Sequence, residues 1–175
     1  MMEIPEKISL FRAYVGNTSA ENNLVGITDE VTLPEFEFMS ETLSLAGMPG
    51  EVDSPSVGQM KSAQIEIPFS NISKHALKLA ADDSQPLILR GAQEVLDSTT
   101  MTKRNVGRVI TVMGMTKSVN YGKLKKGGYG EPSIKKEIIT YKDVVDGEVV
   151  TDINKIDPKC VINGVDLLKG VTDLL

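Results

Sequence analysis

Several residue types that protein chemistry often relies on are scarce or missing in this chain. Its 175 residues include no tryptophan, one cysteine and one histidine. A single cysteine excludes a disulfide within the chain and a metal site built from several cysteines, and it is compatible with a reducing compartment. Aromatic residues make up only 5% of the chain. We therefore expect a core made mainly of valine, isoleucine, leucine and methionine.

Excess positive charge and long apolar runs are also missing. The net charge is −5 and the pI is about 5.0, which argues against a general binder of nucleic acid or anionic membranes, because neutralising phosphates requires a basic surface. No window approaches the roughly 18 apolar residues of a membrane span. The N-terminal stretch lacks a signal-peptide run. We expect a soluble protein made in the cytoplasm, with one domain over 1–175.

Alternating apolar residues indicate β-strands along most of the chain. The expected strands cover 8–16, 24–36, 61–69, 86–95, 106–119, 134–145 and 148–156. Pro34 places the second of these near a sheet edge or a bend. The dipeptides Asp146-Gly147 and Asn163-Gly164 are typical of tight turns, and the first is a strong hairpin signal.

One segment, 71–82, changes to the helical period. Ile72, Ala76 and Leu79 recur at helical spacing, and Ser70 or Asn71 is the expected N-cap. About seven or eight strands and one helix indicate a mainly β fold. We predict an antiparallel β-barrel or sandwich with one flanking α-helix, about 71–82, and long inter-strand loops.

The strand pattern at 35–45 changes phase. Phe36 and Phe38 are apolar at even positions, whereas Met39 and Leu43 are apolar at odd positions. Because alternate residues of a strand point to opposite faces, the two ends of this segment present apolar surface to opposite sides. Either a β-bulge changes the phase, or a long strand leaves its own core and meets a second partner.

No group of residues assembles a nucleophile, a base and an orienting group. A helix-surface position is the simpler interpretation of His75, and a buried, inert thiol is the simpler interpretation of Cys160. Asp82 and Asp83 are interpreted as helix terminators. The Gly- and Lys-rich loop at 120–133 lacks the phosphate-loop pattern and joins two strands. We predict no enzyme, no catalytic residue, no metal and no cofactor.

The same loop carries the one basic cluster of the chain. The candidate contact residues there are Lys123, Lys125, Lys126 and Tyr129. Two interpretations stay open at this point. The loop is either a solvated hairpin, or it docks onto an acidic surface, which in a chain of net charge −5 includes another copy of itself.

Three motifs carry a resemblance to a known family. They are "VTLPEFE", "AGMPGEVD" followed by Gly58, and an ending made of Asp146-Gly147-Glu148, Asp152–Lys155 and Ile162–Asp166. Across roughly 5–170 the chain resembles the major tail tube proteins of contractile-tailed bacteriophages, typified by the P2-like tube protein. It departs from that pattern in a shorter segment before the helix and in Val161-Ile162 before the Asn-Gly pair, which affect loop detail.

The resemblance implies a single tail-tube domain that forms hexameric rings, stacked into the hollow inner tube of a contractile tail. In that family, strands of six subunits join into an inner barrel. The implied partners are the chain itself, the tail sheath protein and the tape-measure and baseplate proteins, with DNA passing through the lumen unbound. The implied location is a virion tail or bacteriocin particle assembled in the host cytoplasm. A DNA-free bacteriocin or related injection system, or a small-ligand-binding β-barrel, are the alternatives.

If the chain is a tail tube subunit, as the resemblance implies, we predict that the Gly- and Pro-rich loop at 47–59 is an assembly contact. Its candidate contact residues are Gly47, Met48, Pro49, Gly50, Val52, Pro55 and Gly58. We expect its deletion to leave the subunit folded and to abolish polymerisation. Glu37, Glu41 and Glu66 are the candidates for the lumen, where negative charge would repel DNA phosphates.

Overall fold

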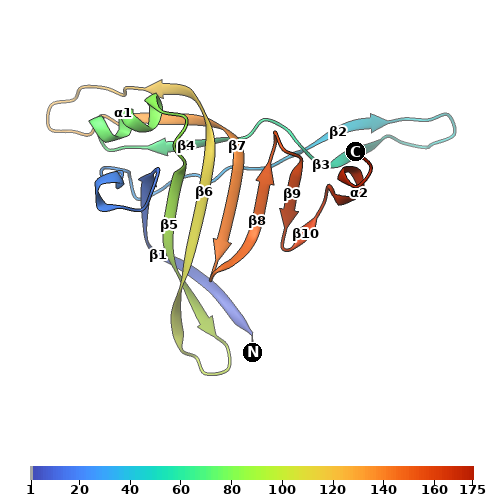
Figure 1. Cartoon of the computed structure of the whole chain (residues 1–175), viewed down its shortest axis with the longest axis horizontal. Helices are drawn as coiled ribbons and strands as arrows, with labels where there is room; N and C mark the ends of the chain where they lie inside the picture. The colour runs from blue at the N-terminus through green and yellow to red at the C-terminus, as the bar shows by residue number, and fades with distance from the viewer. Residues whose placement is uncertain (1) are drawn as a thin grey trace.

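Residues 2–175 are described by the computed structural model, and most of them lie in β-strands (Figure 1). The elements are β1 (Glu3–Val15), the 3-10 helix η1 (Ala20–Asn22), β2 (Phe38–Leu43), β3 (Val52–Met60), β4 (Gln64–Pro68), α1 (Lys74–Ala81), β5 (Leu87–Asp97), β6 (Lys103–Asn120), β7 (Ser133–Val145), β8 (Glu148–Asn154), β9 (Lys159–Ile162), β10 (Val165–Asp166) and α2 (Lys169–Thr172). The prediction of a mainly β fold with one flanking helix is confirmed. No helix among residues 2–175 has the length and apolar character that a membrane span requires.

Eight strands form one antiparallel sheet in the order β1-β5-β6-β7-β8-β9-β10, with β4 paired to β7 outside this path. One edge of β7 pairs with β6, and the other edge is shared between two strands. β4 pairs with residues 133–137 and β8 with residues 140–145. The sheet curves without closing, because β1 and β10 do not pair with each other (Figure 1). The barrel alternative is therefore wrong, and a sandwich-like arrangement fits.

A bulge in β7 changes which side chains face the core. Ile134, Lys136 and Ile138 are buried in its first half, whereas Tyr141 and Asp143 are buried in its second half. The change from even to odd positions coincides with a register shift, since Gly114 pairs with Ile138 and Met113 with Thr140. An extra residue in one strand reverses the alternation beyond it.

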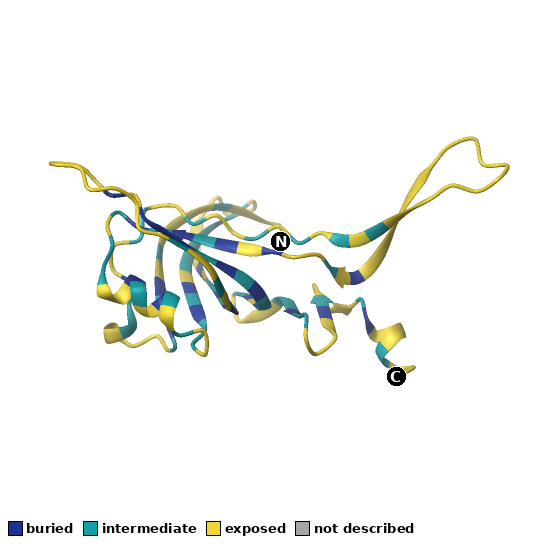
Figure 2. Ribbon diagram, turned by 90° about the horizontal axis from the view of Figure 1, so that it is seen from above, coloured by how far each residue is buried: buried dark blue, intermediate teal, exposed yellow. Residues whose placement is uncertain are grey.

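The core lies between one face of the curved sheet, which includes β4, and a cover made of α1 and the segment 24–38. Ile65, Ile67 and Phe69 from the β4 region and Leu79 of α1 are almost completely buried. In the cover, Phe36 meets Tyr141 of β7 edge to face, with ring centroids 5.0 Å apart. Figure 2 shows buried residues concentrated in this body, whereas the paired β2 and β3 extend from it as an exposed ribbon.

The segment predicted as a strand at 24–36 is instead an extended cover with bends. Its backbone forms isolated bridges in place of a ladder, Ile27 with Phe69 and Thr32 with Glu66. Pro34 lacks an amide hydrogen, and Gly26 has φ 98, so a continuous ladder is not formed.

The helix starts later than predicted. Its N-cap is Ser73, whose hydroxyl accepts a hydrogen bond from the amide of Ala76 at 3.1 Å. The prediction of Ser70 or Asn71 as the cap was therefore wrong, because Ser73 offers the same side-chain chemistry at the position where the helical dihedrals begin. Ten strands are found among residues 2–175 where seven or eight were expected.

We predict that Leu79→Ala lowers the free energy of unfolding by about 2–5 kcal/mol, because it leaves a cavity between α1 and the sheet. Leu124→Ala is the matched control, since Leu124 is fully exposed and its truncation is expected to change stability by less than about 0.5 kcal/mol. Urea unfolding measures both variants. Equal stability losses would contradict the assigned core.

Candidate assembly surfaces

The segment predicted as a loop at 47–59 is largely a strand. β2 and β3 pair antiparallel from Met39–Ser56 to Leu43–Val52 and form a two-stranded ribbon that we call the arm, residues 38–60. Of the predicted contact residues, Gly47, Met48, Pro49 and Gly50 lie in the turn at the tip, and Val52, Pro55 and Gly58 lie in β3. Proline and glycine suggested a loop, but a ribbon that has no third strand tolerates Pro55.

The phase change in the sequence marks the point where the arm leaves the body. Phe36 and Phe38 pack against the core, whereas Met39 and Leu43 are exposed. The ladder shifts register between Phe38 and Met39. The ladder therefore contains an irregularity and the strand leaves its own core, whereas its contact with a second partner stays a prediction.

The arm carries aliphatic side chains that are exposed to solvent. Met39, Leu43, Leu45, Met48, Val52 and Val57 are all exposed, with exposed fractions of 36% to 58%. The charged residues of the arm are Glu41, Glu51 and Asp53, and residues 38–60 contain no lysine, arginine or histidine. The arm is therefore an acidic ribbon with an apolar component.

The root of the arm is held by close packing. Gly58 has φ 87, and a β-carbon there would lie 2.5 Å from Cδ2 of Leu168, just before α2. This position therefore requires glycine for two reasons, the backbone conformation and the approach of Leu168. Beside it, the amide of Lys61 donates to the carbonyl of Glu37 at 2.8 Å, and their side chains form an ion pair at 2.7 Å.

Glu137 of β7 anchors the connection between the arm and β4. Its carboxylate accepts hydrogen bonds from the Ser62 hydroxyl at 2.8 and 2.9 Å and from the Ala63 amide at 3.2 Å. Lys155 and Lys117 approach it at 3.6 and 3.9 Å. Burial raises the pKa of Glu137, but these hydrogen bonds and lysine charges outweigh it, so the net shift lowers the pKa. No signal in the sequence points to this role, because Glu137 is one of several polar residues in an alternating strand pattern.

The second predicted surface is the loop between β6 and β7, residues 121–132, which we call the basic loop. Lys123 pairs within the loop with Glu131 at 2.6 Å. Among residues 2–175, Lys125 and Lys126 form no ion pair. Tyr121, Leu124 and Tyr129 are exposed. At the neck, the Gly130 amide donates to the carbonyl of Ser70 at 3.1 Å.

The three carboxylates predicted to face a lumen lie in different surroundings. Glu37 is paired with Lys61 at the arm root, and Glu66 of β4 lies 3.6 Å from Lys135. Glu41 lies on the arm without an ion-pair partner among the described residues. Their place in a lumen stays a prediction.

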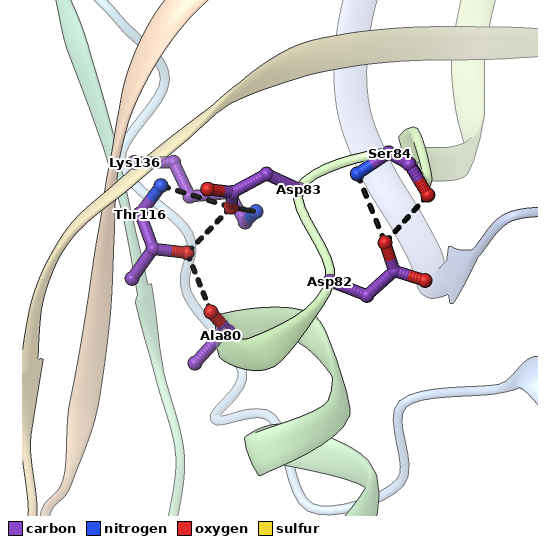
Figure 3. A network of polar contacts seen from close by, with 6 residues as sticks. All are labelled: Ala80, Asp82, Asp83, Ser84, Thr116 and Lys136. Atoms are coloured by element: carbon purple, nitrogen blue, oxygen red, sulfur yellow. Dashed lines mark hydrogen bonds and ion pairs between the residues drawn. The ribbon is translucent and has the colours of Figure 1, made fainter.

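Asp83 joins the end of α1 to the sheet (Figure 3). Its Oδ1 accepts from Lys136 Nζ at 2.8 Å and from the amide and hydroxyl of Thr116 at 2.9 and 2.8 Å. These contacts, led by the hydrogen bond from Lys136, lower the pKa of Asp83. Lys136 is nearly completely buried. Asp82 terminates the helix as predicted, and its carboxylate accepts hydrogen bonds from Ser84. Asp83 was predicted to do only the same, and its link to Lys136 and Thr116 was missed because those residues are far away in the sequence.

The remaining chemical candidates stay apart. His75 is exposed on α1, and Cys160 is buried, which raises the pKa of its thiol. Residues 2–175 contain no group of three His, Cys, Asp or Glu placed to hold a metal ion. A largely apolar cavity of about 680 Å³ lies between β1, β5, β6 and the segment 23–33. Arg108 lines it, but its guanidinium is engaged by Asp143 at 2.6 Å.

One of two comparisons with known proteins gives a match. A family model described as phage tail tube protein FII matches residues 5–175. Among curated proteins, no sequence matches the chain.

We predict that Glu137→Gln lowers the free energy of unfolding at neutral pH and makes that free energy less dependent on pH under acidic conditions. Because the folded pKa of Glu137 lies below its ordinary value of 4.5, its stabilising contribution is present above that pH and is lost as the pH falls through the folded pKa. Urea unfolding at about pH 7 and about pH 3 measures this effect. Glu148→Gln, at an exposed position of β8, is the control. Parallel pH profiles for wild type and Glu137→Gln would refute the anchoring role.

Proposed function

The chain belongs to the phage tail tube protein FII family, and we propose that it self-assembles into hexameric rings stacked as the hollow inner tube of a contractile tail. The observation that carries this proposal is the arm. A two-stranded ribbon on its own is marginally stable in water, and this one extends from the body with its aliphatic side chains exposed (Figure 2). Contact with a neighbouring subunit would bury those side chains and hold the ribbon.

The open sheet also favours assembly. Its terminal strands are β1 and β10, and they do not pair with each other. Exposed strand edges promote association between chains. Pairing of edges between subunits would use both ends of the sheet and would place curved sheets side by side around a common axis, which is the geometry of a ring.

The net charge of −5 fits a conduit. A lumen of negative potential repels phosphates, so that DNA would pass without binding. The implied partners are a tail sheath protein around the tube, and tape-measure and baseplate proteins at its ends. The role proposed for the whole chain, 1–175, is structural, not enzymatic, in a tail particle assembled in the host cytoplasm.

The test of this function is negative-stain electron microscopy of the purified protein at rising concentration. Rings or hollow tubes are the expected result. A monomer at every concentration would refute the proposal, and a monomer that binds a metabolite would favour the small-ligand-binding alternative and its cavity. Genes for a capsid and packaging enzymes beside this one would identify a phage, and their absence would favour a bacteriocin or a related injection system.

The structure revises the expected effect of shortening the arm. Deleting 47–59 removes most of β3 and leaves β2 without its partner, so that variant does not test assembly alone. Replacing 41–54 by Asn-Gly joins the paired residues Ser40 and Pro55 through a two-residue turn, and it keeps Gly58 against Leu168.

We predict that this shortened variant folds as the wild type does and forms no tubes, because the tip and its apolar side chains are absent. Circular dichroism and urea unfolding measure the fold, and electron microscopy measures assembly. The control replaces 98–101, the turn between β5 and β6, by Asn-Gly. Tubes formed by the shortened variant at wild-type concentrations would show that the arm is not an assembly contact.

A further inference from the structure

The two longest projections of the molecule lie at opposite ends of its long axis. Figure 1 shows the arm extending from one side of the sheet, and the basic loop between β6 and β7 extending from the other. Figure 2 shows the same separation in a view turned by 90°. The two projections of one copy are therefore not placed to contact each other, but each is available to another copy.

The charges of the two projections are opposite. The arm carries Glu41, Glu51 and Asp53 and no basic residue. The basic loop carries Lys125 and Lys126 without ion-pair partners among residues 2–175, whereas its Lys123 is already paired with Glu131. Opposite charges that are unpaired within each subunit favour an encounter between the arm of one copy and the loop of another.

Both projections also expose apolar side chains that could pack against each other. Leu124 and Tyr129 stand out from the basic loop, with exposed fractions of 105% and 72%. The arm exposes a row of aliphatic side chains, among them Leu43 and Leu45. Burying apolar side chains contributes to association in proportion to the area removed from water, and the surrounding charges fix which surfaces meet.

Resting on the proposed self-assembly, we propose that the acidic arm of one subunit docks on the basic loop of the next. Glu41 and Glu51 face Lys125 and Lys126 across this contact, and the arm's aliphatic side chains cover Leu124 and Tyr129. Two different surfaces at opposite ends of one chain make a heterologous contact, and its head-to-tail repetition from copy to copy generates a ring or a helical stack.

The test is a charge exchange read by sedimentation velocity and electron microscopy. Lys125→Glu with Lys126→Glu is expected to raise the concentration needed for half-assembly by about tenfold or more, because two favourable charge pairs become repulsive. Glu41→Lys with Glu51→Lys is expected to do the same. The four changes combined in one chain are expected to restore assembly, because each contact again joins opposite charges.

Mixing gives a sharper readout. The two double variants fail separately, but in an equimolar mixture each arm meets a loop of opposite charge, so alternating copolymers are expected. The matched control is Lys74→Glu with Lys169→Glu, which makes the same change in net charge at the exposed first residues of α1 and α2. It is expected to assemble as the wild type does.

The outcomes separate this inference from the proposed function. If the wild type forms tubes and the lysine variant forms them at the same concentration, the arm-to-loop contact is wrong and the tube function stands. If the wild type itself never assembles, the proposed function fails and the contact with it. If fluorescein-labelled single-stranded DNA binds the wild type but not the lysine variant, and assembly is unchanged, the loop binds nucleic acid and the inference is overturned.

Discussion

The shared edge of β7 is the constraint on which the rest of this structure depends. β8 pairs with one half of that edge and β4 with the other, so the chain that leads out of the arm must enter the sheet at 64–68. Glu137 lies in the half that pairs with β4 and binds Ser62 and Ala63, which fixes the connection immediately before β4. Hydrogen bonding in the sheet therefore sets where the arm joins the body, and the packing of Gly58 against Leu168 holds its root.

The same edge positions the helix and the basic loop. Lys136, next to Glu137, points to the other face and binds Asp83 at the end of α1. β7 begins at Ser133, directly after the basic loop, whose neck is hydrogen-bonded to Ser70 between β4 and α1. Adjacent residues of one strand thus hold the arm connection on one face and the helix on the other, because side chains alternate along a strand.

Local signals in the sequence predicted the mainly β fold and several of its elements. The alternation at 106–119 and 134–145 and the Asp146-Gly147 turn depend on neighbouring residues only, and the structure has β6, β7 and a positive-φ turn there. The pairing of 52–60 with 38–43 was missed, because proline and glycine are typical of loops. Whether Pro55 and Gly58 lie in a strand depends on the presence of the partner strand β2. The sequence did not decide between an open and a closed sheet, and the roles of Asp83 and Glu137 were missed, because each depends on residues far apart in the chain. The contact residues on the arm and basic loop remain predictions.

The bulge in β7 has a consequence for how reliably this sheet folds. Sliding a regular strand by one residue exchanges its two faces, and sliding it by two restores the pattern, so alternation alone leaves several pairings nearly equivalent. In β7 the buried set lies on even positions from 134 to 138 and on odd positions at 141 and 143. No slip by a whole number of residues superimposes this mixed pattern on itself. The bulge therefore helps to specify the strand register, because only the native pairing buries all of these side chains.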